Sequence, residues 1–177
     1  MAIRDAKGNL HSEINGRFIE KQEAAGRIDG GDTTTSYYST EKVTKYLSGF
    51  DEIEPAFRSL IRDGKINLTI CQGLQDKHIL GTNNYRQEIA AGRNPSVLWY
   101  PDPQQLVLDY AGTGRLTKKD DGDILWTRRE LVTANQYIGY AVAPQNGQIY
   151  LTRSFTIHYS DKGVHIVPRR EDDNGFI

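Results

Sequence analysis

Between residues 41 and 110, most hydrophobic positions follow a helical spacing, and after residue 114 they alternate as in β-strands. Residues 52–61 place four apolar side chains on one helical face, and Gly64 is expected to end that helix. Gly92 stands at a C-cap position, and Pro103 stands in a first helical turn. The further predicted elements of this part are helices at 41–47, 83–91 and 103–110 and a strand at 66–71.

Four strand-like segments follow, separated by turn-forming residues such as Pro144-Gln145-Asn146-Gly147. They are 124–133, 136–143, 149–160 and 163–169. Helices followed by an antiparallel run of strands predict an α+β domain.

The segments divide the chain into four parts. Residues 1–40 show little periodicity and many small or polar residues, which predicts a flexible linker or junction. We expect a helical lead-in at 41–72, the main domain at 73–170 and a tail at 171–177.

The last two predicted strands carry a polar face. Alternation along 149–160 puts Thr152, His158 and Ser160 on one side. If Asp161-Lys162 is a two-residue loop, His158 stands opposite His165. Asp-x-Gly also suits a type I turn with a glycine bulge, which would send His165 to the other face. The hydrophobic pattern favours the first register and the turn chemistry the second, so both stay open.

The charge balance excludes a polyelectrolyte. The 177 residues carry a formal net charge of −1, with a pI near 6.4. Any nucleic-acid contact must therefore come from a local patch. No apolar run reaches about 20 residues, the length that spans a bilayer, and the N-terminus lacks the order of a secretory signal. The single cysteine, Cys71, is expected to be a small side chain in a strand.

Three of the four histidines lie in two short segments, 75–82 and 156–168. A histidine titrates near neutral pH and can give or take a proton, so a fold that joins these segments would hold an acid, a base and the charge of Lys77. Taken singly, each histidine is more often a hydrogen-bonded structural residue. A zinc site stays a minor alternative, because no His-x-x-x-His or Cys-x-x-Cys spacing supports it.

Several ordered motifs resemble one known family. They are Gln75-x-Lys77-His78-Ile79-x-Gly81-Thr82-Asn83-Asn84, Asp102-Pro103-Gln104-x-Leu106, Ala111-Gly112-Thr113-Gly114, Ile138-Gly139-Tyr140, Thr152, and Ile157-His158-Tyr159-Ser160-x-x-Gly163-x-His165-Ile166-Val167-Pro168. Together they resemble the polymorphic toxin type 50 domain over about 73–170.

The resemblance implies a ribonuclease toxin with a fold like barnase, EndoU and the nuclease colicins, in which N-terminal helices pack on a four-stranded antiparallel sheet. It implies a domain at the C-terminus of a larger secreted, contact-dependent or phage-associated protein, acting in the cytoplasm of a target cell. Residues 1–40 would be the remains of a junction. The implied partners are RNA, with transfer RNA one option by analogy, and a neutralising immunity protein, and no cofactor is implied.

The site that the resemblance implies needs a base for the ribose 2′-hydroxyl, an acid for the leaving 5′-oxygen and a cation for the phosphorane. His78 and His158 match the acid–base pair, without an order between them, and Lys77 matches the cation. The other expected catalytic-site residues are Thr152, Ser160 and His165. Because Lys77 and His78 are adjacent, they would diverge on a regular helix or strand.

RNA contacts are expected from basic and aromatic side chains. The residues assigned to them are Gln75, Arg86, Arg115, Arg153 and Tyr159, and further arginines that could contact phosphates are Arg93, Arg128, Arg129, Arg169 and Arg170. Two alternatives remain: a non-catalytic binding or structural module of a phage capsid-associated protein, and a phosphodiesterase acting on small nucleotides.

Overall fold

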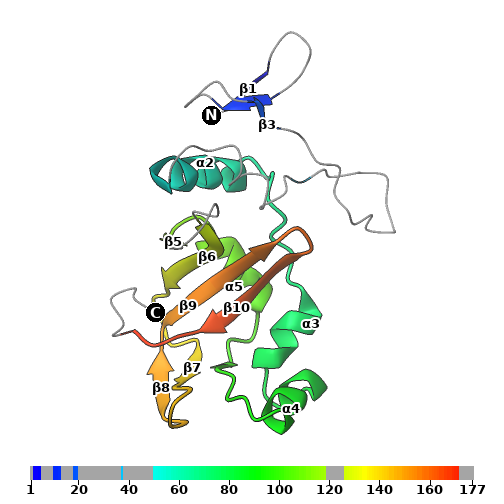
Figure 1. The fold of residues 1–177 in the computed structure, drawn as a ribbon, viewed down its shortest axis with the longest axis vertical. Helices are drawn as coiled ribbons and strands as arrows, with labels where there is room; N and C mark the ends of the chain where they lie inside the picture. Colours follow the sequence, from blue (N-terminus) through cyan, green and yellow to red (C-terminus); the bar gives the residue numbers. More distant parts are fainter. Residues whose placement is uncertain are drawn as a thin grey trace.

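The computed structural model of the protein describes residues 2–4, 10–12, 18–19, 37, 50–118 and 126–171 (Figure 1). The helices are α2 (Phe50–Arg62), α3 (Gln72–Gln75), the 3₁₀ turn η1 (Asp76–His78), α4 (Asn83–Ala90) and α5 (Pro103–Tyr110). The strands after α2 are β4 (Val97–Leu98), β5 (Arg115–Lys118), β6 (Trp126–Thr133), β7 (Gly139–Val142), β8 (Ile149–Thr152), β9 (Ser154–Ser160) and β10 (Gly163–Pro168).

Three short strands lie in the segment expected to be a linker. β1 (Ala2–Arg4), β2 (Leu10–Ser12) and β3 (Phe18–Ile19) form a small antiparallel sheet. Apart from these strands and residue 37, residues 1–40 fall outside the described residues, as does the helix expected at 41–47.

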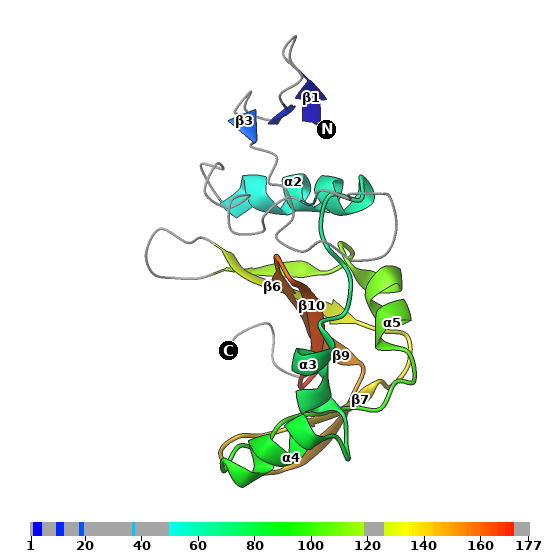
Figure 2. The ribbon, with the colours of Figure 1, turned by 90° about the vertical axis from the view of Figure 1, so that its right-hand side faces the viewer.

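The main sheet has four antiparallel strands in the order β10-β9-β6-β5. Two helices cover one face of it, and Figure 2 shows α5 on that side of β9 and β10. Phe57 of α2 meets Tyr159 edge-to-face at 4.8 Å between ring centroids, and Tyr110 of α5 meets Phe155 at 5.9 Å. The predicted α+β class, with helices against a four-stranded antiparallel sheet, is confirmed.

The segment 149–160 is two strands, so the prediction of one continuous strand is wrong. β8 pairs with β7 in a second sheet of order β4-β7-β8, whereas β9 belongs to the main sheet. The chain changes sheets at Arg153, where the Thr152 hydroxyl accepts from the Ser154 amide at 2.9 Å and donates to the Arg169 carbonyl at 2.5 Å. A side chain thus satisfies backbone groups that a continuous ladder would have paired.

Most of the other predicted elements are present, although their lengths differ from those expected. α2, α4 and α5 are confirmed, with Gly64, Gly92 and Gly112 in the left-handed region after them. The strand expected at 66–71 is reduced to one parallel bridge between Ile70 and Val164. Besides β1, β2 and β3, the elements that the sequence patterns did not predict are β4, β5, α3 and η1.

The outer edge of β10 is closed by the segment that precedes α3. The Cys71 amide donates to the Val164 carbonyl at 2.7 Å, and the Val164 amide donates to the Thr69 carbonyl at 2.9 Å. The approach is so close that a Cβ on Gly163 would overlap the Thr69 carbonyl oxygen, and Gly163 has a φ of +124°. Only glycine fits this contact without strain.

Gln75 extends the same edge contact with its side chain. Its amide nitrogen donates to the Ile166 carbonyl at 3.2 Å, and its amide oxygen accepts from the Ile166 N–H at 2.8 Å. The side chain is fully buried and replaces the neighbouring strand that β10 lacks. Gln75 therefore fixes η1, which follows it directly, against the middle of β10.

Gln75→Ala should lower the free energy of unfolding by about 1–3 kcal/mol, because it leaves the buried N–H and carbonyl of Ile166 without partners. Gln105→Ala is the matched control, since Gln105 is exposed on α5 and its side chain bonds Asp109 one helical turn away. Urea denaturation followed by circular dichroism measures both. Equal stability of the two variants would contradict the role assigned to Gln75.

Candidate active site

His158 and His165 face each other across the β9–β10 hairpin. Their Cα atoms are register partners, and their ring centroids lie 4.6 Å apart at an interplanar angle of 48°. Ser160 pairs with Gly163 at the turn, and its hydroxyl donates to the Gly163 carbonyl at 2.8 Å. The first of the two registers considered, with a two-residue loop, is confirmed.

His78 joins this pair from the other side of β10. Its ring lies 6.3 Å from the His165 ring between centroids, with planes only 11° apart. Its Nδ1 donates to the Ser96 carbonyl at 2.9 Å, which leaves the lone pair on Nε2. The two distant histidine segments of the sequence therefore meet in one cluster of His78, His165 and His158.

Lys77, the residue before His78, forms an ion pair with helix α4. Its ammonium lies 3.2 Å from Glu88 of α4, and Glu88 also pairs with Arg93. These partners, Arg93 first, hold the pKa of the Glu88 carboxyl below its usual range. The Lys77 charge still lowers the pKa of both His78 and His165, so it lies at the rim of the cluster.

The protein environment disfavours the protonated, cationic form of all three imidazoles. Burial first, and the charges of His165 and Arg129 next, lower the pKa of His158 to about 3. Burial and the charges of His78 and Lys77 lower the pKa of His165 to about 4. Burial also lowers the pKa of His78, against the opposing effect of its bond to Ser96. The rings are therefore neutral at pH 7 and can accept protons.

The strand register places arginines around the cluster. Arg129 of β6 is the Cα partner of His158, and Arg115 of β5 is the partner of Leu131, on the same face. Arg169 extends the β10 pairing through its N–H bond to the Ser154 carbonyl. Among the described strand residues on this face none is a carboxylate, and the charged ones are arginines.

The one carboxylate in the middle of the described main sheet, Glu130, lies on the opposite face and is fully buried. It accepts from the Tyr159 hydroxyl at 2.5 Å and from the amides of Gly112 and Gly114 at 3.0 and 2.6 Å. Burial and this carboxylate raise the pKa of the Tyr159 hydroxyl. Tyr159 is thus a core residue, and its ring is covered from the solvent.

The remaining expected site residues lie apart from the histidine cluster or have structural partners. Thr152 is buried at the corner between β8 and β9, and Gln75 is bonded to Ile166. Arg153 pairs with Glu171, whereas Arg86 is exposed on α4. Of the expected RNA-binding residues, Arg115 is the one that shares the face of the histidines.

Two contributors were not singled out from the sequence. Ser96 fixes the His78 tautomer through a loop carbonyl, for which no sequence pattern exists. Arg129 was one of many arginines in the sequence. Strand alternation along 124–133, combined with the first hairpin register, could have predicted that it lies on the same sheet face as the histidines.

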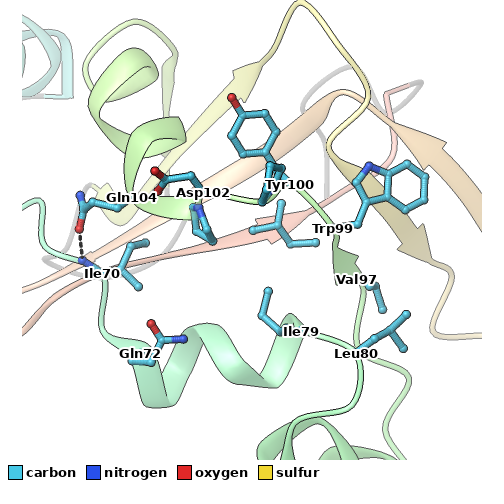
Figure 3. A pocket seen from close by; sticks show the side chains of 12 residues that line it. Ile70, Gln72, Ile79, Leu80, Val97, Trp99, Tyr100, Asp102 and Gln104 are labelled. Carbon is cyan, nitrogen blue, oxygen red and sulfur yellow. Dashed lines mark hydrogen bonds between the residues drawn. The ribbon is translucent and has the colours of Figure 1, made fainter.

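An apolar groove lies beyond η1 (Figure 3). It has a volume of about 560 Å³ and runs between Ile79 and Leu80 on one side and the segment 97–104 on the other. Ile79 and Leu80 both line this groove, whereas His78, which precedes them, is not among its lining residues.

In the part of the chain that the structure describes, no group of three or more His, Cys, Asp or Glu side chains is arranged to hold a metal ion. In the same part, every helix is too short or too polar to cross a membrane.

The family model described as bacterial toxin 50 matches residues 70–168, which is more than half of the chain. The chain therefore belongs to the bacterial toxin 50 family of polymorphic toxin domains. No curated protein matches it.

His158→Asn should weaken the acid sensitivity of the fold. The pKa of His158 is about 3 in the folded protein, against 6.5 for an ordinary histidine such as that of the unfolded chain, so the unfolded chain binds the extra proton between these values. The stability from this group is complete above pH 6.5 and is lost as the pH falls toward about 3. Urea unfolding at pH 7 and pH 4 should show a smaller loss for the variant than for the wild type. An identical loss would contradict the assigned environment of His158.

Proposed function

We propose that this bacterial toxin 50 domain is an endoribonuclease that works without a metal. The observation that carries the proposal is the meeting of His78, His165 and His158, from two distant segments, on a sheet face whose described charged strand residues are basic. Neutral imidazoles accept protons, and a basic surface attracts a polyanion. RNA supplies both the phosphate and the 2′-hydroxyl nucleophile that such a site can use.

In the proposed reaction, Nε2 of His78 takes the proton of the ribose 2′-hydroxyl. The 2′-oxygen attacks the adjacent phosphorus, the bond from phosphorus to the 5′-oxygen breaks, and a protonated His158 gives its proton to that oxygen. The products are a 2′,3′-cyclic phosphate and a free 5′-hydroxyl, so atoms and charges balance. His78 is assigned as the base because its Nδ1 is committed to Ser96.

Protonation of His158 depends on the substrate. Its pKa is about 3 because the ring is buried beside positive groups. A phosphate monoanion placed beside the ring opposes both effects and raises that pKa. His165, between the other two histidines, is assigned to the phosphate oxygens, and Lys77 supplies positive charge at the rim.

The architecture supports a likeness to barnase, EndoU and the nuclease colicins. Helices cover one face of a four-stranded antiparallel sheet, and the candidate site lies on the other face. Membership of a toxin family supports delivery from a larger protein into the cytoplasm of a target cell, and neutralisation by an immunity protein. Transfer RNA is the proposed substrate by analogy with other nuclease toxins.

The wild type should cleave total RNA in EDTA and leave 2′,3′-cyclic phosphates. His78→Ala and His158→Ala should each lower the rate by about 10²–10⁴-fold, the usual contribution of an acid or base. His11→Ala is the matched control, since the fourth histidine belongs to β2, far in sequence from the two histidine segments. Gel analysis with end mapping reads both rate and product.

Two outcomes would contradict the proposed function. An absence of cleavage by the wild type in any RNA would favour a non-catalytic binding module. Activity that disappears with EDTA and returns with a divalent cation would favour a metal-dependent reaction.

The pH profile of kcat/KM should be bell-shaped with its maximum below pH 6.5. Raising the pH removes the proton from the acid His158, and lowering it protonates the base His78, whose pKa values are both below the ordinary 6.5. Initial rates at subsaturating RNA measure the profile, with circular dichroism confirming a folded protein at each pH. A maximum at pH 8 or above would refute the acid–base assignment.

A further inference from the structure

We propose that Arg129 binds the scissile phosphate of the RNA and is the principal cation that stabilises its transition state. The inference rests on the proposed ribonuclease function and deepens it, because it assigns the phosphate position to one side chain of the central strand β6.

The register gives Arg129 its position. It is the Cα partner of His158, and His158 is in turn the partner of His165, so the three residues form one row across β6, β9 and β10. Directly opposed side chains on one face of a sheet have Cβ atoms about 4.5–5.5 Å apart. Arg129 is also solvent-exposed, so an RNA phosphate can reach its guanidinium.

Position distinguishes Arg129 from the other candidate, Lys77. The Lys77 ammonium lies 3.2 Å from Glu88 of α4, whereas Arg129 lies in the row of His158 and His165. The charge of Arg129 is one of the causes, after burial, that lower the pKa of His158 and of His165. Its register position beside His158 matches the place where a phosphate would have to sit for His158 to protonate the leaving oxygen.

The neighbouring groups on this face are polar or basic. From β9 the side chain that faces Arg129 is His158. Arg115 and Arg169 lie on the same face, both displaced from the row in the direction of Leu131, one on the β5 side and one on the β10 side of the sheet. We therefore expect the RNA backbone to run from the scissile phosphate at Arg129 toward these two arginines.

Guanidinium chemistry makes the assignment specific. Arginine can give two parallel hydrogen bonds to two phosphate oxygens, whereas lysine acts as a point charge. Arg129→Lys keeps the positive charge but loses the two parallel hydrogen bonds, and Arg129→Gln loses both the charge and these bonds. Arg62→Gln is the control, because Arg62 is an exposed arginine of α2 and its loss changes the net charge equally.

The test measures kcat and KM with RNA, and the affinity for an all-2′-deoxy oligonucleotide, which has no attacking hydroxyl. Arg129→Gln should lower kcat by about 10²–10³-fold, as loss of one oxyanion donor does, with Arg129→Lys intermediate and Arg62→Gln unchanged. Arg129→Gln should also weaken oligonucleotide binding. The pKa of His158 should rise in this variant, seen by NMR, which a purely structural role would not produce.

The outcomes separate the two claims. Cleavage by the wild type with unchanged kcat in Arg129→Gln overturns the role of Arg129 and leaves the ribonuclease standing. A wild type that binds the oligonucleotide through Arg129 but cuts no RNA overturns the ribonuclease and retains the phosphate site. A wild type that neither cuts nor binds overturns both.

Discussion

Everything at the candidate site depends on how the outer edge of β10 is closed. One edge of β10 pairs with β9 and brings His165 opposite His158. The other edge receives the Thr69–Cys71 backbone and the Gln75 amide, and so holds η1 with His78 in place. β10 is therefore the element through which segments about 80 residues apart share a site. Gly163 is required there because only a residue without a Cβ permits the backbone approach.

The main sheet separates its charges by face. Toward the core, one buried carboxylate, Glu130, is satisfied by a hydroxyl and two amides. Toward the other face, imidazoles and arginines gather with no described carboxylate among the strand residues. Such a face is electrostatically unfavourable on its own, because its positive groups repel and its histidines stay neutral. A bound phosphate would relieve this repulsion, which links the depressed histidine pKa values to the proposed chemistry.

The sequence predicted the parts of the fold that local patterns determine. Helices α4 and α5 follow from their spacing and caps, and the hydrophobic alternation favoured the hairpin register that pairs His158 with His165. The predictions of these helices and of the register hold because each depends on residues close in sequence. The family resemblance predicted that His78 and His158 act in one site, and in the structure the His78 ring lies near the His165 ring.

The parts that were missed depend on contacts between distant residues. The corner at Arg153 arises from hydroxyl bonds of Thr152 that strand alternation does not encode. Gln75 was expected to contact RNA, and its burial follows from a partner, Ile166, 91 residues away. Arg129 stood among many arginines until the β6–β9 register placed it beside His158. Side-chain roles of this kind follow from register and burial.

Whether the three histidines form one electrostatically coupled cluster is best decided by ¹⁵N NMR titration of their imidazoles. His158 and His165 should titrate well below 6.5, with pKa values of about 3 and about 4. His78 should be the Nδ1–H tautomer, and the pKa of His158 should rise in His165→Asn. Three histidines that titrate independently near 6.5, with no response to that substitution, would contradict the coupled cluster.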